Sequence, residues 1–276
     1  MKKLILIIST LALLCGCTTA EQPKQKAPRK VAVQMWTTHD YTLEESIIGL
    51  AKCGIDTIET TPIQPIAKKF GKKALFNHYA TQEQRDFVKN LLKQYNMKIC
   101  TIYCRPPKDE ADLKQLMEFG KFFGVNMYVS ESRENMLPLW EKYCEQYGAK
   151  MAIHCHQRGS NTPYWDPKVV RKIVDQYKHI GFCAETGAWS RSGVDPIEAL
   201  KVAEGKILAL HLKDQKTFND IKSAGVNYGT GCLDMKGILA ELDRQGFNHY
   251  YVIEQGDDQK NAFEIVKANK KYLSEN

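Results

Sequence analysis

Residues 151–212 read MAIHCHQRGSNTPYWDPKVVRKIVDQYKHIGFCAETGAWSRSGVDPIEALKVAEGKILALHL, and this stretch decides the fold. It holds three short apolar runs that are typical of buried strands: Met151–His156, Ile180–Glu185 and Ile207–Leu212. Helical patterns separate them, and each begins with an aspartate N-cap before a proline, at Asp166-Pro167 and Asp195-Pro196. Strands that alternate with helices predict a parallel sheet with helices on its faces.

The same alternation extends over the rest of the chain. Five more runs have the character of buried strands: Val31–Trp36, Thr57–Thr60, Lys98–Cys104, Val125–Ser130 and Tyr250–Glu254. Thr42 with Glu45 forms a capping box at the start of one intervening helix, and Thr81 with Gln84 forms another. Eight strands with eight crossovers predict one α/β domain, a single (β/α)8 TIM barrel over residues 30–276.

A doubly wound open sheet is the alternative architecture for such an alternation. That fold favours a glycine-rich phosphate loop directly after the first strand. Here the first run is followed by Thr37-Thr38-His39-Asp40, which is neither a GxGxxG motif nor a P-loop. The barrel is therefore the preferred prediction.

The composition is that of a globular protein. The chain has 276 residues, of which 43% are hydrophobic and 26% charged, so it can bury a full core and is neither disordered nor fibrous. Its formal net charge is +7, but part of that excess lies before residue 31. The globular part is thus close to neutral, and we expect no nucleic-acid partner. None of the nine cysteines forms a CxxC pair, and nothing in the sequence indicates an oligomeric state.

The first residues have the pattern of a bacterial lipoprotein leader. A positive start at Met1–Lys3 precedes an apolar run that is too short to span a membrane, and the sequence Leu14-Cys15-Gly16-Cys17 follows it. We expect a signal peptide over residues 1–16, a lipid on Cys17 and a polar tether over residues 17–29. This predicts a protein of the cell envelope, on the periplasmic side, attached to the membrane through its lipid alone. An ordinary signal peptide with an incidental cysteine is the alternative.

Acidic and imidazole side chains gather where the expected strands end. The catalytic groups of such a barrel lie at the carboxyl ends of its strands. The candidates at these ends are Glu59, Glu131, His154, His156, Glu185, His211, Lys213 and Glu254. Residues two apart on a strand point the same way, so His154 shares a face with His156, and His211 with Lys213. So many titrating groups at one mouth favour a bound divalent cation.

The C-terminal motifs resemble those of a known family. The run His211-Leu212-Lys213-Asp214, then Gly229-Thr230-Gly231-Cys232-Leu233-Asp234 before a helix, then Val252-Ile253-Glu254-Gln255, resembles the sugar phosphate isomerase/epimerase family of xylose isomerase-like TIM barrels. Its ketose epimerases hold one divalent metal with Glu, Asp, His and Glu from strands five to eight. The resemblance implies the metal ligands His154, Glu185, His211 and Glu254.

The chain departs from the epimerase pattern at two of these positions. Strand five offers His154 in place of a glutamate, which resembles the members with His-x-His on this strand. Strand six has Glu185-Thr186-Gly187-Ala188 where relatives show Asp-Thr-Gly-His. The missing glutamate is half of the epimerases' acid/base pair. Four possible metal ligands remain, but the epimerases' symmetric mechanism with two glutamates cannot operate without the strand-five glutamate.

The expected chemistry is enolisation beside a sugar carbonyl. Two imidazoles and two carboxylates suit one divalent ion of Zn, Mn, Co or Fe, which would polarise that carbonyl. Glu254 is the first candidate for the base that removes the α-proton, with His156 and Glu59 as alternatives. Lys213 could stabilise the developing oxyanion.

We expect elimination or hydration, because only one base remains. The expected envelope location favours an unphosphorylated keto-sugar or glycoside as the substrate, because phosphorylated intermediates are held in the cytosol. Trp36, Trp165 and Trp189 follow strand ends and could stack on a sugar ring. A true sugar isomerase or epimerase and a non-catalytic sugar-binding lipoprotein are the alternatives. An endonuclease IV-like DNA repair enzyme shares the barrel, but it needs a richer zinc ligand set and a basic DNA-binding face.

Overall fold

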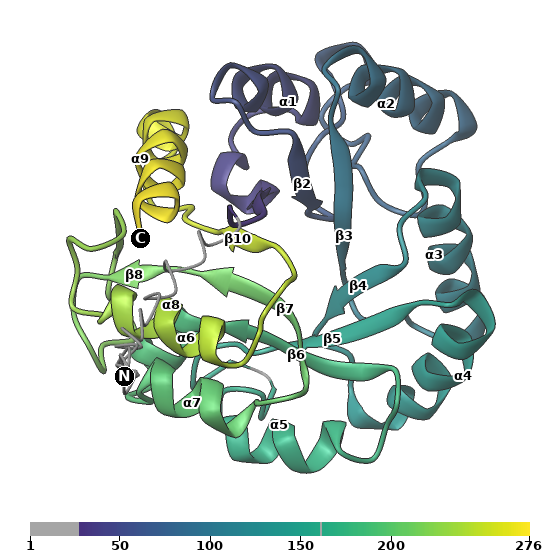
Figure 1. Cartoon of the computed structure of the whole chain (residues 1–276). Coiled ribbons are helices and arrows are strands. Elements are labelled where there is room, and N and C mark those ends of the chain that lie inside the picture. The colour runs from purple at the N-terminus through teal and green to yellow at the C-terminus, as the bar shows by residue number, and fades with distance from the viewer. Residues whose placement is uncertain (1–27, 161) are drawn as a thin grey trace, which may run out of the picture.

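The computed structural model describes residues 28–160 and 162–276. The expected signal peptide, Cys17 and the tether up to residue 27 lie outside the described residues. Within the described part, eight parallel strands close into a barrel in the order β1-β10-β7-β6-β5-β4-β3-β2. Figure 1 shows the helices as an outer ring around these strands. The predicted single (β/α)8 barrel is confirmed.

The strand and helix bounds follow the predicted alternation closely. The barrel strands are β1 (Val31–Gln34), β2 (Thr57–Thr60), β3 (Lys98–Cys104), β4 (Met127–Ser130), β5 (Lys150–His154), β6 (Ile180–Glu185), β7 (Ile207–Leu212) and β10 (Tyr251–Ile253). The helices are α1 (Leu43–Lys52), α2 (Gln82–Gln94), α3 (Glu110–Phe123), α4 (Leu137–Tyr147), α5 (Pro167–Val174), α6 (Thr186–Arg191), α7 (Pro196–Val202), α8 (Met235–Arg244) and α9 (Ala262–Glu275). Helix α9 packs beside α1, where the ring of helices closes.

Local sequence determines where the helices begin. Both capping boxes form, so Thr42 caps α1 and Thr81 caps α2 through the backbone N–H three residues later. Asp166 and Asp195 accept N–H groups at the first turns of α5 and α7, with a proline at the first position of each helix. Asp234 caps α8 in the same way.

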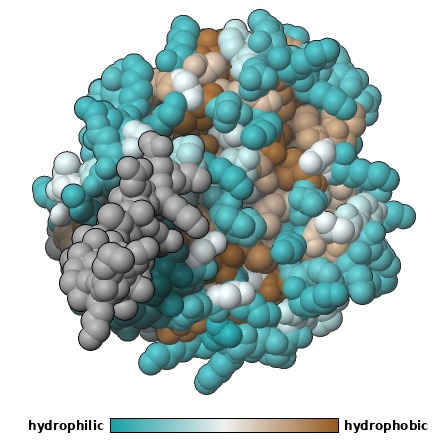
Figure 2. All heavy atoms as spheres, in the orientation of Figure 1, coloured by the Kyte–Doolittle hydropathy of each residue, from teal (hydrophilic) through white to brown (hydrophobic). Residues whose placement is uncertain are grey.

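The core has an outer and an inner part. The outer part lies between strands and helices and includes the fully buried Leu50, Trp140 and Val170. The inner part is a layer of small side chains within the barrel, formed by Val129, Ala152, Cys183 and Ala209. In Figure 2, hydrophilic side chains dominate the rim of the molecule, and apolar atoms show toward its centre. The inner layer is the floor of the site described below.

The structure also contains elements that the sequence did not predict. Helix α6 follows β6 directly, and a small antiparallel hairpin of β8 (Asp214–Gln215) and β9 (Gly225–Val226) follows β7. Strand β5 ends at His154, so His156 lies in the loop beyond it rather than on the strand. All seven cysteines in the described part are free thiols. No helix among the described residues is long and apolar enough to cross a membrane.

Candidate functional site

A layer of polar side chains covers the inner small-residue layer at the carboxyl end of the barrel. On β5, β6 and β7, residues two positions beyond Ala152, Cys183 and Ala209 point into the same interior. These residues are His154, Glu185 and His211, and all three are buried. The neighbouring strands add Glu59, Tyr103, Glu131 and Glu254 to the same mouth. The structure thus brings together the strand-end groups that the sequence singled out.

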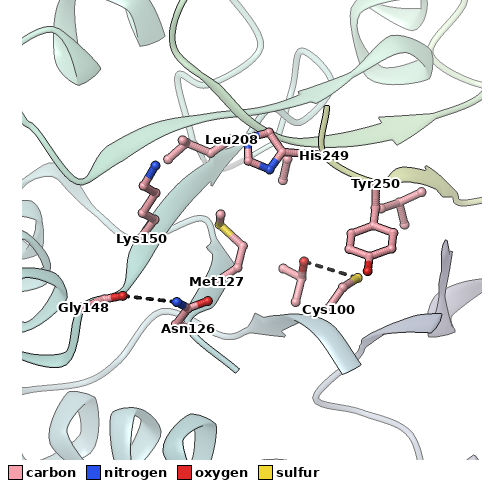
Figure 3. Close-up of a pocket in the computed structure, with 11 residues that line it drawn as sticks. Cys100, Asn126, Met127, Gly148, Lys150, Leu208, His249 and Tyr250 are labelled. Carbon is pink, nitrogen blue, oxygen red and sulfur yellow. Dashed lines mark hydrogen bonds between the residues drawn. The ribbon is translucent and has the colours of Figure 1, made fainter. Parts of the chain in front are cut away.

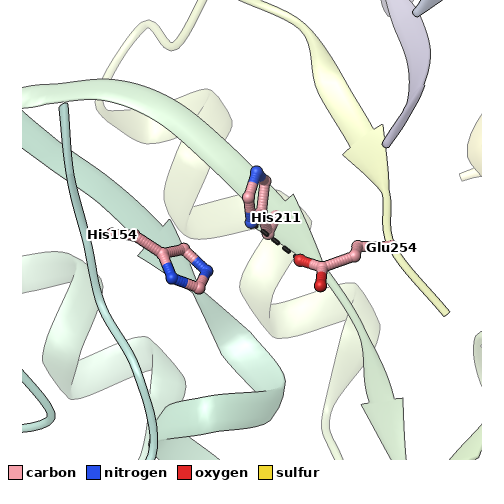
Figure 4. Close-up of side chains that lie close together, drawn as sticks. All are labelled: His154, His211 and Glu254. Carbon is pink, nitrogen blue, oxygen red and sulfur yellow. Dashed lines mark ion pairs between the residues drawn. The ribbon is translucent and has the colours of Figure 1, made fainter. Parts of the chain in front are cut away.

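Three of the four predicted ligands form one compact group. Each of His154, His211 and Glu254 offers a ligand atom within 4.8 Å of the others (Figure 4). His211 Nδ1 and Glu254 Oε2 are 2.7 Å apart. They form an ion pair with each other, and neither atom has a hydrogen-bond partner elsewhere among the described residues. His154 Nε2 is also buried and has no hydrogen-bond partner there. A bound cation would satisfy ligand atoms that converge in a buried space with so few partners, so these residues fit a metal ion.

Glu185 lies at the edge of this group. Its Oε2 is 3.8 Å from His154 Nε2, so the carboxylate faces the same space. Its Oε1 accepts the backbone N–H of Ala188 at the start of α6 and lies 3.1 Å from Lys213 Nζ. One carboxylate oxygen is therefore occupied, while the other points toward the three-residue group.

Glu59 lies behind His211 rather than in the open mouth. Its Oε1 is 2.6 Å from His211 Nε2, and neither side chain is exposed to solvent. The imidazole thus faces Glu59 with one nitrogen and Glu254 with the other. A carboxylate that accepts Nε2–H fixes the orientation of the ring, so Nδ1 is the nitrogen that a metal would bind after displacing a proton.

His154 is held in a similar way from the opposite side. Its Nδ1 lies 3.1 Å from Glu131 Oε1, and Tyr103 donates its hydroxyl to the same carboxylate oxygen at 3.0 Å. Burial, followed by the charges of Glu131 and Glu254, raises the pKa of Tyr103 well above its usual value. Tyr103 therefore stays protonated as a donor, and His154 keeps Nε2 turned toward the ligand group. The sequence pattern does not single out Tyr103, because a tyrosine inside a strand is most often a core residue.

Lys213 forms ion pairs with two of the carboxylates in the site, those of Glu185 and Glu254. Its Nζ lies 3.1 Å from Glu185 Oε1 and 3.0 Å from Glu254 Oε1. The hydroxyl of Thr186 donates to the backbone carbonyl of Lys213 and accepts its N–H. A Cβ on Gly187 would lie 2.8 Å from the Cβ of Lys213, so only glycine lets α6 approach this closely. The Glu185-Thr186-Gly187 sequence thus serves to hold Lys213.

The charges of neighbouring side chains keep Lys213, Glu254 and His211 ionised despite their burial. Burial opposes the charge on Lys213, but Glu185 and Glu254 raise its pKa above the usual value. Burial would raise the pKa of Glu254, yet Lys213 and His211 hold it well below its usual range. Burial also opposes a charge on His211, whose pKa is nevertheless raised well above normal by Cys183, Glu59 and Glu254. Carboxylates outnumber permanent cations in the cluster, so a divalent cation is electrostatically favoured there.

The glycine-containing motif before α8 is an anchor for its own loop. Asp214 accepts the backbone N–H groups of Gly229 and Gly231, each at 2.9 Å, and that of Leu233 at 3.2 Å. Gly229 has a φ of +77°, which favours glycine. Asp214 is fully buried and follows Lys213 directly. The motif therefore fixes the segment between β7 and α8 beside the site.

His156 lies next to His154, in the loop that follows β5. Its ring centroid is 5.7 Å from that of His154. Its Nδ1 is buried without a hydrogen bond. Trp36, Trp165 and Trp189 were the tryptophans expected to stack on a sugar ring. Trp189 is fully buried and thus unable to stack on a ligand, whereas Trp36 is 37% exposed.

A separate hollow of about 320 Å³ lies at the other end of the barrel. Figure 3 shows Cys100, Lys150, His249 and Tyr250 among the residues that line it. Its lining contains no carboxylate, and none of the ligand group described above reaches it. The candidate ligand group lies instead at the opposite, carboxyl-terminal mouth.

Comparison with known proteins defines the family. Residues 49–275 match the model of the xylose isomerase-like TIM barrel family, and the chain belongs to that family. No curated protein matches the chain in sequence.

Solved structures agree with this assignment. A putative uncharacterized protein from Parabacteroides distasonis ATCC 8503 is 26% identical, with a TM-score of 0.70 over 90% of this chain and 98% of that one. The probable 3-DHS dehydratase AsbF from Bacillus anthracis is 15% identical, with a TM-score of 0.68 over 88% and 98%. The IOLI protein, solved with a zinc atom, is 21% identical, with a TM-score of 0.65 over 88% and 95%. The last two share the fold with this chain.

Proposed function

We propose that this protein is a metal-dependent enzyme that enolises a keto-sugar or a keto-glycoside next to its carbonyl. The observation that carries the proposal is the group of His154 Nε2, His211 Nδ1 and Glu254 Oε2, three buried potential ligand atoms that lie within 4.8 Å of one another at the mouth of the barrel. Family membership supports it, because structures with the same fold include an L-ribulose 3-epimerase and a probable dehydratase.

His154, His211 and Glu254 would hold the ion, with Glu185 as the fourth ligand. Two imidazoles with carboxylates suit Zn, Mn, Co or Fe better than Ca or Mg. Bound there, the ion would supply Lewis acidity toward a substrate carbonyl.

The residues around the ligands divide the remaining tasks. Lys213 presents an ammonium group, with a side chain only 13% exposed, where it can hold a substrate hydroxyl or an oxyanion. Glu254 is a weak base in this place, since Lys213 and His211 lower its pKa. Glu59 contacts His211 through Oε1 and is completely buried behind the imidazole. We therefore assign proton transfer at the substrate to His156.

His154, at the end of β5, favours elimination or the reverse reaction, hydration, over epimerisation. A ligand glutamate has a second oxygen that can act as a base, whereas both nitrogens of His154 are committed, one to Glu131 and one to the ligand group. Removal of a proton from one face and its return to the other needs two bases. A single residue can remove the α-proton and return it to a departing oxygen on the same face.

Product analysis with defined substrates tests this proposal. The metal-loaded protein is incubated with a free ketose, an inosose and a 3-keto-glycoside, and the products are followed by NMR. We expect dehydrated or cleaved products from the last two and no rapid epimerisation of the ketose. The metal-free protein is the control and should be inactive.

Two results would contradict the proposal. Rapid epimerisation of the ketose without elimination from the other substrates would identify a true sugar epimerase. Tight carbohydrate binding with no reaction in the metal-loaded protein would identify a binding protein instead.

A further inference from the structure

We propose that a hollow next to His154 binds a negatively charged substituent, so that the substrate is an anionic sugar derivative. The hollow has a volume of about 360 Å³ and is lined by Arg105 and Arg133 together with Tyr103 and Glu131. This inference rests on the proposed function, because it takes the neighbouring ligand group as the reaction centre.

The hollow is joined to the ligand group through shared side chains. Tyr103 and Glu131, which line it, are the two residues that contact His154 Nδ1, at 3.3 Å and 3.1 Å. They come from β3 and from the end of β4, and Arg105 and Arg133 follow the same two strands. A substrate that reaches the ligand group from this side therefore passes the two arginines.

The two guanidinium groups have no partner in the described part of the chain. Neither Arg105 nor Arg133 forms an ion pair, whereas Arg29, Arg191 and Arg244 each face a carboxylate. The carboxylate in the lining is Glu131, and its oxygen already contacts His154 and Tyr103. The charge available to a ligand in this hollow is thus positive.

Two guanidinium groups that line one hollow favour an anionic ligand. Their planar N–H donors match the two oxygens of a carboxylate or the oxygens of a phosphate, and they discriminate strongly against a neutral hydroxymethyl group. A sugar whose terminal carbon is a carboxylate, or carries a phosphate, would place its charge here while its carbonyl region reaches His154 and Lys213.

Binding measurements on the metal-loaded protein test the inference. D-glucuronate, glucose 6-phosphate and D-glucose are titrated calorimetrically at about 0.15 M salt, where contributions from distant charges are screened. We expect at least one of the two anions to bind about tenfold more tightly than glucose. Whichever anion binds more tightly identifies the charged group as a carboxylate or a phosphate.

Three arginine variants test whether the preference for an anion depends on the two arginines of the hollow. Arg105→Gln and Arg133→Gln should each remove most of the preference for the anion and leave glucose binding unchanged. Arg158→Gln is the control, since it removes the same charge from a rim residue that follows β5 but does not line the hollow. Equal affinity for all three ligands, or an equal loss in all three variants, would overturn the inference. Anion binding that depends on Arg105 and Arg133 in a protein without turnover would support this site and count against the proposed function alone.

Discussion

Glu59 shows how the position of one residue limits its role. Its carboxylate is completely buried and 2.6 Å from His211 Nε2, so it faces an imidazole rather than a substrate. The sequence could not distinguish a base from such a support, because both roles need a carboxylate at the end of a strand. We infer that Glu59 orients His211 and fixes its tautomer, with Nδ1 free as a ligand.

Substitution of Glu59 should weaken metal binding without abolishing the fold. Loss of such a supporting carboxylate typically lowers metal affinity about 10–100-fold. We expect this loss in Glu59→Ala and a smaller one in Glu59→Gln, whose amide oxygen can still accept Nε2–H. Competition with a chelator measures the affinity, and circular dichroism verifies the fold. Unchanged affinity in Glu59→Ala would show that His211 needs no such support.

His156 should matter for turnover and not for the metal. His156→Ala removes the proposed acid/base group, and such groups contribute about 10²–10⁴-fold to rate. The loss should be larger for a 3-keto-glycoside with a poor alkyl leaving group than for one with an aryl leaving group, because the aryl oxygen needs less help from an acid. Metal content should equal that of the unmodified protein. An equal reduction of the turnover rate for both substrates would show that another residue protonates the leaving group.

At the scale of elements, the N-terminus of α1 has a built-in pH dependence. The Glu45 pKa falls from 4.5 to about 2, chiefly because Lys68 and the backbone N–H of Thr42 bind its charged form. Because the folded-state pKa is depressed, this stabilisation is fully present above about pH 4.5 and disappears as the pH falls toward 2.

A comparison of thermal unfolding at two pH values tests this contribution. Glu45→Gln should lower the unfolding midpoint slightly at pH 7, since the pair is solvent-exposed and screened. At pH 3 the difference from the unmodified protein should shrink. Lys68→Ala should show the same trend. Lys72→Ala, which removes a charge that forms no ion pair within the described part of the chain, should not. A difference that grows toward low pH would contradict the assigned direction.

Elements with strong local patterns were predictable from the sequence, and those set by tertiary contacts were not. Strands β2, β3, β6 and β7 match their predicted bounds, because each is a short run rich in β-branched or apolar residues. Helix α6 was missed, since Thr186-Gly187 reads as a loop and the helix depends on Glu185 as its cap. The hairpin after β7 was also missed, because its strands have only two residues each. In the site, the residue types were predictable, but the contacts of Glu59 and Tyr103 across the barrel were not.

At the scale of the molecule, we propose that the barrel is tethered to the cell envelope through Cys17. The leader sequence supports this proposal, and the lipid would provide the whole attachment. Cys17→Ser should therefore release the protein from membranes in a fractionation experiment. The protein with Cys15→Ser is the control and should remain bound, because the lipid is expected on Cys17. A Cys17→Ser protein that still sediments with membranes after a high-salt wash would contradict the proposal.

The carboxyl-terminal mouth of the barrel is proposed as a metal-dependent enolisation site. The fate of the substrate α-proton in D₂O tests this proposal, because enolisation must remove that proton. With a 3-keto-glycoside and the metal-loaded protein, we expect deuterium to replace the α-proton in unreacted substrate, or the α-proton to be lost as the elimination product forms. Both signals should stop on chelation, return when the metal is restored, and be absent in His211→Ala. Loss of the α-proton at an unchanged rate in the chelated protein and in His211→Ala would contradict the proposal.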